Sequence, residues 1–120
     1  GGIPGTPNLA ACKKLTDNIV EYNRQGKWLA AICAAPGTLE YFNILEGKDC
    51  TSYPGCIEDK DKVNYIEDEL VVVDKNIITS RGPATALMFA LKILEELGYI
   101  NEMEEIKESM LVNLYNKYAK

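Results

Sequence analysis

Histidine is absent from the 120 residues of this sequence. Ser-His-Asp and Cys-His catalytic pairs, zinc sites with histidine ligands and imidazole proton shuttles all need the ring that is missing. Any catalytic chemistry must therefore rely on thiol, carboxylate, hydroxyl, lysine or arginine groups.

Long apolar runs and clusters of basic residues are also lacking. No run approaches the ~18 apolar residues of a membrane-spanning helix, so we expect no membrane association. Asp and Glu number 18 against 13 Lys and Arg, which gives a net charge of −5. Because an acidic surface repels phosphate backbones and no basic face stands out, we do not expect nucleic acid as a partner.

Four cysteines are present, and they form no C-x-x-C pair typical of zinc ribbons or redox dithiols. They are Cys12, Cys33, Cys50 and Cys56. Free thiols favour a reducing compartment, and we therefore expect a cytoplasmic location.

The length and composition indicate one ordinary globular folding unit, with 47% hydrophobic and 26% charged residues. The chain opens on Gly1-Gly2-Ile3-Pro4-Gly5, without a preceding strand. Glycine clusters usually connect elements rather than begin domains. We therefore expect residues 1–120 to be the C-terminal portion of a single larger domain.

Apolar periodicity predicts alternating helices and strands in the first half of the chain. We expect one helix from an N-cap at Thr6 to Gly26, a strand over 28–32 buried on both faces, a helix over 36–45 and a short strand over 49–52. Helix, buried strand and helix in this order are typical of an α/β fold with a parallel sheet.

The second half predicts a β-hairpin followed by two helices. Residues 70–74 and 77–80 flank Lys75-Asn76, where we expect Asn76 to adopt a positive φ. A helix then runs from Pro83 to Gly98, and Asn101 with Glu104 forms a capping box for a final helix.

Cys33 stands where the buried strand stops and the next helix begins, followed by Ala34-Ala35-Pro36. Small residues at such a sharp turn are typical of a nucleophile elbow, where helical N–H groups stabilise a thiolate and a developing oxyanion. The alternative is that Cys33 is a small buried apolar residue, and periodicity alone does not decide between them. We expect Cys12 in the core, Cys50 in a strand and Cys56 in a loop.

Three motifs in order resemble the ThiJ/PfpI superfamily, and within it the DJ-one and ThiJ/YajL deglycase branch. They are Gly1-Gly2, the segment Leu29-Ala30-Ala31-Ile32-Cys33-Ala34-Ala35-Pro36, and Thr79-Ser80-Arg81-Gly82-Pro83-Ala84-Thr85. The resemblance implies a flavodoxin-like, class I glutamine amidotransferase-like three-layer sandwich with a mostly parallel sheet. It also implies a homodimer.

The resemblance assigns Cys33 as the reactive residue and the N–H groups of Gly2 and Ala34 as its oxyanion pocket. It also places an acidic partner in an N-terminal segment that this chain does not contain. Tyr53 stands where many relatives carry histidine, and we expect it to contact the pocket or a dimer partner. The same expectation applies to Arg81 and Pro83, with a structural ion pair as the alternative for Arg81.

Two functions follow from this resemblance. The first is a cofactor-independent, metal-free glyoxalase or deglycase in which Cys33 attacks 2-oxoaldehydes or their adducts. The second is a non-enzymatic redox-sensing stress protein or chaperone that uses the same oxidisable thiol. Peptidase activity is not expected, because Ala34 occupies the position where peptidase-like relatives have histidine.

Overall fold

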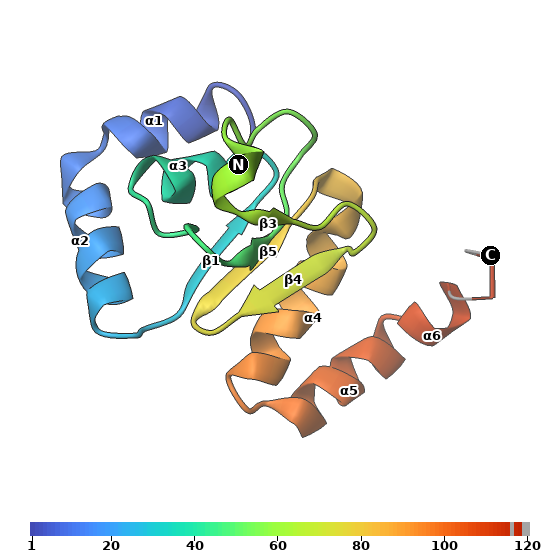
Figure 1. Ribbon diagram of the computed structural model, residues 1–120. Coiled ribbons are helices and arrows are strands. Elements are labelled where there is room, and N and C mark those ends of the chain that lie inside the picture. Colours follow the sequence, from blue (N-terminus) through green and yellow to red (C-terminus); the bar gives the residue numbers. More distant parts are fainter. Residues whose placement is uncertain (116, 119–120) are drawn as a thin grey trace. The chain divides into compact units, whose positions relative to one another are not determined.

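The computed structural model describes residues 1–115, 117 and 118, and the chain divides into two compact units, 1–89 and 90–120. The first unit is built on a three-stranded sheet of β1 (Leu29–Ile32), β4 (Val71–Asp74) and β5 (Ile77–Ser80). β5 lies in the middle, parallel to β1 and antiparallel to β4 (Figure 1). A second sheet pairs β2 (Asp49–Cys50) in parallel with β3 (Asn64–Tyr65). The α/β class and the mostly parallel sheet are confirmed.

The predicted β-hairpin is present, but its turn differs from the expectation. The positive φ, 52°, belongs to Lys75 and not to Asn76. The Asn76 side-chain amide instead donates to the carbonyl of Lys27 at 2.9 Å and to Asn23 Oδ1 at 3.2 Å. Asn76 therefore ties the hairpin to the segment that leads into β1.

The two parallel strands differ in burial. All four residues of β5 are buried, because this strand has neighbours on both sides. In β1, Ala31 is buried but Ala30 is exposed. The expectation that this strand is buried on both faces is therefore wrong, because Ala30 borders an open hollow beside α2.

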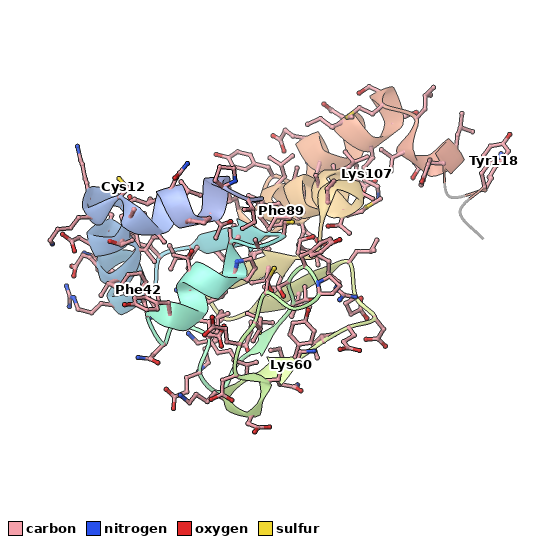
Figure 2. All side chains as sticks on the ribbon, turned by 90° about the horizontal axis from the view of Figure 1, so that it is seen from above. Cys12, Phe42, Lys60, Phe89, Lys107 and Tyr118 are labelled. Atoms are coloured by element: carbon pink, nitrogen blue, oxygen red, sulfur yellow. The ribbon has the colours of Figure 1, made fainter. Side chains whose placement is uncertain are left out.

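The single helix expected before β1 is in fact two, α1 (Gly5–Ala11) and α2 (Lys13–Arg24). Cys12 separates them with an extended ψ of 96°. Thr6 is not an N-cap, because its N–H already donates to the Gly2 carbonyl at 2.8 Å inside the first turn. Cys12 is exposed at the junction, so its predicted core position is also wrong (Figure 2).

The helix after Cys33, α3 (Pro36–Tyr41), ends earlier than predicted. Asn43 adopts a positive φ of 59°, and the Ile44 N–H donates back to the Leu39 carbonyl at 3.0 Å. This bond across five residues is the Schellman arrangement that stops a helix. The apolar residues that follow, Ile44 and Leu45, enter the core from a turn.

The core of the first unit joins α3, β1, β2 and β5. Its buried members are Ala31, Leu39, Ile44, Leu45, Cys50, Ile57 and Ile77. Burial of apolar surface contributes about 25 cal/mol per Å², so this cluster is the main support for the segments at the strand ends.

The remaining elements are the short helices η1 (Lys60–Lys62) and η2 (Pro83–Thr85) and three α-helices. The α-helices are α4 (Ala86–Glu96), α5 (Ile100–Ser109) and α6 (Val112–Tyr115). The predicted capping box is wrong, because Tyr99 is the N-cap of α5 and no side chain caps it. Leu111, with φ 61°, interrupts the expected final helix. None of the helices among the described residues is both long and apolar enough to span a membrane.

Candidate active site

Cys33 occupies a sharp turn directly after β1. Its φ is 64°, a left-handed conformation that costs a residue with a side chain roughly 1–2 kcal/mol. Backbone bonds on both sides hold it there: its N–H donates to the Ser80 carbonyl at 3.0 Å, and its carbonyl accepts the Tyr53 N–H at 2.8 Å. Strain of this kind is characteristic of functional positions. The turn leaves the Cys33 side chain half-buried.

The Gly1-Gly2 segment lies against this turn. A Cβ at Gly1 would lie 2.5 Å from the Ile32 carbonyl oxygen and 3.2 Å from Cys33 Cβ, so only glycine fits. Gly2 has a φ of 75°, which also favours glycine. Together with the bond from Cys33 to Ser80, this contact brings all three motifs to the same turn, although they are far apart in the sequence.

Two backbone donors near the turn are free to bind a ligand. Within the described part of the chain, the N–H groups of Gly2 and Ala34 have no acceptor in a backbone or side-chain hydrogen bond. Ala34 is buried, with 7% of its surface exposed. An unpaired N–H in a buried segment is costly unless something accepts its hydrogen bond, as a bound oxyanion does.

The loop after β2 packs against the N-terminal end of α3. The Cys56 N–H donates to the Tyr53 carbonyl at 3.1 Å, and a Cβ at Gly37 would come within 2.7 Å of the Cys56 carbonyl oxygen. The Glu40 carboxylate accepts the N–H groups of Glu58 and Asp59 at 2.9 and 2.8 Å. These contacts hold the loop after β2 in place at Cys56 and at the two residues Glu58 and Asp59.

Tyr53 and the segment that follows β5 also meet. The Tyr53 ring lies 3.5 Å from where a Cβ of Gly82 would stand, and half of its surface is exposed. Arg81 Nε donates to the Ser52 carbonyl at 3.1 Å, and its Nη1 donates to the Glu67 carbonyl. Arg81 thus bonds to backbone oxygens rather than to a carboxylate. These bonds connect the segment after β2 with the segment between β3 and β4. Pro83 is exposed at the start of η2.

An open hollow of about 660 Å³ lies beside α3, and of the predicted site residues Ala34 lines it whereas Cys33 does not. Ala34, Gly37, Thr38 and Cys56 contribute to its lining, together with Thr6 from α1. The Thr6 hydroxyl is buried and has no hydrogen-bond partner among the described residues. Thr6 was not among the predicted site residues, because a threonine directly before a proline predicts a helix N-cap. A separate, largely apolar hollow between α2 and β1 contains none of the predicted site residues.

The two thiols that follow Cys33 in the sequence have different electrostatic surroundings. Burial raises the pKa of the Cys50 thiol to about 11, with the charges of Glu40, Asp49 and Asp74 acting in the same direction. Burial also raises the pKa of Cys56, and the negative charge of Cys33 adds to this shift.

Comparison with known proteins identifies the family. The model of the DJ-1/PfpI family matches residues 1–96, which include all six predicted site residues. The chain belongs to the DJ-1/PfpI family. Its fold is therefore the flavodoxin-like α/β fold of that family.

Individual DJ-1 proteins support the assignment. Drosophila melanogaster protein dj-1beta is 39% identical over 113 residues, and its crystal structure superposes with a TM-score of 0.84. The match covers 93% of this chain and 60% of the relative. The glutathione-independent glyoxalase DJ-1 of Schizosaccharomyces pombe is 30% identical over 112 residues, which cover 92% of this chain and 58% of that protein.

A third relative is a solved structure of Toxoplasma gondii DJ-1 described as oxidized. It is 32% identical with a TM-score of 0.82, and the match covers 92% of this chain and 60% of that one. The chain thus spans about 60% of the length of these three relatives.

Proposed function

We propose that this chain carries the cysteine nucleophile of a cofactor-independent glyoxalase or deglycase that acts on 2-oxoaldehydes or their adducts. The observation that carries the proposal is Cys33 at a strained turn, with the glycine pair against it and two unpaired N–H groups nearby. A relative named as a glutathione-independent glyoxalase supports the reaction class.

In the proposed reaction, the Cys33 thiolate adds to the aldehyde carbon and forms a hemithioacetal. The N–H groups of Gly2 and Ala34 donate to the oxygen that becomes negatively charged. A carboxylate from an N-terminal segment of the same protein takes the proton from the former aldehyde carbon and returns it to the neighbouring carbon, which converts the hemithioacetal into a 2-hydroxy thioester of Cys33. Water then releases a 2-hydroxy acid and restores the thiol.

The remaining predicted residues shape the site in this proposal. Tyr53 stands where many relatives carry histidine, and in this proposal its ring borders the site. Arg81 positions Tyr53 by holding the Ser52 carbonyl. Exposed Pro83 and the half-exposed Tyr53 ring contact a second copy in the proposed homodimer. We place the protein in the cytoplasm, where its four free thiols persist.

The direct test is the consumption of methylglyoxal by the full polypeptide, with lactate measured over many equivalents of substrate per protein. We expect multiple turnovers in the wild type. Cys33→Ser should lower kcat/KM by about 10³-fold or more, because no other group in this proposal forms the covalent bond.

Cys12→Ser is the matched control, because it removes an exposed thiol away from the site. It should retain wild-type turnover. Equal rates in Cys33→Ser and wild type would refute the proposed nucleophile, and a wild type without turnover would refute the enzyme.

The second candidate is a redox-sensing stress protein or chaperone, which is favoured by the structure of a relative described as oxidized. The same Cys33 thiol would be oxidised by peroxide, without catalytic turnover of an aldehyde. Selective oxidation of Cys33 in a protein that does not consume methylglyoxal would favour this function.

A further inference from the structure

The loop that carries Cys56 is attached to the turn at Cys33, although 23 positions separate the two cysteines in the sequence. Two consecutive backbone hydrogen bonds connect them: the Cys33 carbonyl accepts the Tyr53 N–H, and the Tyr53 carbonyl accepts the Cys56 N–H. The loop that carries Cys56 is thus attached to the strained turn itself, and not only to the core.

The position of Cys56 is restricted further by the first turn of α3. Its carbonyl oxygen takes up the space that a Gly37 side chain would need, and Gly37 is the second residue of α3. Glu40 holds the following residues through the N–H groups of Glu58 and Asp59. Because three attachments fix this segment, the two cysteines stay close in the reduced protein.

Both thiols are half-buried, and each is free. Cys56 lines the same hollow as Ala34, the residue after Cys33. Burial raises the pKa of the Cys56 thiol, and the charge of Cys33 acts in the same direction. Cys12 and Cys50 lie elsewhere: Cys12 is exposed between α1 and α2, and Cys50 is enclosed in the core.

We infer that Cys56 is a resolving cysteine that captures an oxidised Cys33 as an intramolecular disulfide. The inference rests on the reactive Cys33 of the proposed function and adds an oxidant class, a hydroperoxide. The Cys33 thiolate attacks the peroxide, the O–O bond breaks, an alcohol or water leaves, and Cys33 becomes a sulfenic acid. Cys56 sulfur then attacks Cys33 sulfur, the S–O bond breaks, and water leaves with the Cys56 proton.

The order of these steps follows from the charges. While Cys33 is a thiolate, its charge opposes ionisation of Cys56. A sulfenic acid is neutral, so oxidation of Cys33 removes that opposition and makes the Cys56 thiolate easier to form. Formation of the Cys33 sulfenic acid therefore favours ionisation of the Cys56 thiol. A disulfide is reducible by thiols, whereas a sulfinic acid is not, so Cys56 keeps the oxidation of Cys33 reversible.

The test is oxidation of the full wild-type polypeptide with one equivalent of hydrogen peroxide, followed by intact and peptide mass spectrometry without reductant. We expect a product lighter by two hydrogen atoms, with the peptides of Cys33 and Cys56 linked, and its reversal by dithiothreitol. In Cys56→Ser, we expect oxygen adducts on Cys33 instead. The yield of Cys33 sulfinic acid should be about tenfold higher than in wild type. Cys12→Ser should form the linked product normally.

A wild type in which Cys33 gains oxygen as fast as in Cys56→Ser, while Cys56 remains reduced, would overturn the inference. That result would leave the proposed enzyme intact if methylglyoxal is still consumed. A Cys33 that stays reduced in both proteins would overturn the inference together with the reactive thiol on which it rests. Mapping the wild-type linkage needs no variant, so a misfolded mutant cannot obscure the answer.

Discussion

Cys33 and Cys50 stand at two sheet segments of the same unit, and their surroundings are opposite. Cys33 follows β1 in a left-handed turn and is half-buried. Cys50 lies inside β2 with none of its surface exposed, packed among the apolar residues of the core. The same residue type therefore occupies two different environments, and in the proposed function only the thiol at the turn takes part in chemistry.

The largest expected difference between the two thiols is in alkylation by iodoacetamide. A pKa of about 11 leaves Cys50 roughly 100-fold less thiolate than an ordinary thiol near pH 8, and burial blocks the reagent as well. We therefore expect native Cys33 to react about 100-fold faster or more. The Cys50 rate should rise about tenfold per pH unit, because its thiolate fraction is still growing below pH 11.

Peptide mass spectrometry over time measures both rates in the same sample. In urea the two rates should converge, since unfolding exposes Cys50 and removes its raised pKa. Equal rates in the native protein would mean that the contrast between the two sites is wrong.

The next largest effect is on stability. Cys50→Ser places a hydroxyl among apolar side chains, and we expect it to lower the free energy of unfolding by about 2 kcal/mol. Cys33→Ser should change this free energy by less than about 0.5 kcal/mol, because its site is half-exposed. Urea denaturation of the three proteins measures the values, and a larger loss at Cys33 would reverse the comparison.

A smaller effect of the opposite sign is expected for Cys33→Gly. Glycine adopts the φ of 64° without steric cost, and after the extra entropy of its unfolded chain a gain of about 0.5–1 kcal/mol remains. The same denaturation experiment detects it, while methylglyoxal turnover is lost. A destabilised Cys33→Gly would show that the turn carries no strain.

The smallest effect is expected at Cys12. This thiol is exposed in an extended residue between α1 and α2, so Cys12→Ser should alter the free energy of unfolding by less than about 0.5 kcal/mol. A loss of 1 kcal/mol or more in thermal or urea unfolding would indicate a contact that matters for the junction of these two helices.

The turn at Cys33 and the hairpin could be predicted because their signals are local. An uncharged run followed by Ala34-Ala35-Pro36 specifies a strand that turns into a helix. The break between α1 and α2 at Cys12 could not be predicted, because apolar residues recur at three- and four-residue steps on both sides of it. Periodicity is the same for one long helix and for two helices separated by one extended residue.

Contacts between distant segments were the least predictable. The resemblance, and not the spacing of residues, suggested that Gly1-Gly2 belongs beside Cys33. The two carbonyls that Arg81 binds have no sequence signature, since every residue has a carbonyl group. The approach of Cys56 to Gly37 is likewise visible only in the folded structure, because a glycine in a sequence does not indicate which backbone atom will lie next to it.

One side of β1 has no strand beside it within the described residues, and its sequence, Leu-Ala-Ala-Ile, is uncharged. Unpaired N–H and C=O groups along such an edge form a template for another extended chain. Charged side chains or proline, which usually block edge-to-edge pairing, do not occur in β1. Residues 1–120 handled alone should therefore associate increasingly with protein concentration, and a strand supplied to that edge should suppress the association.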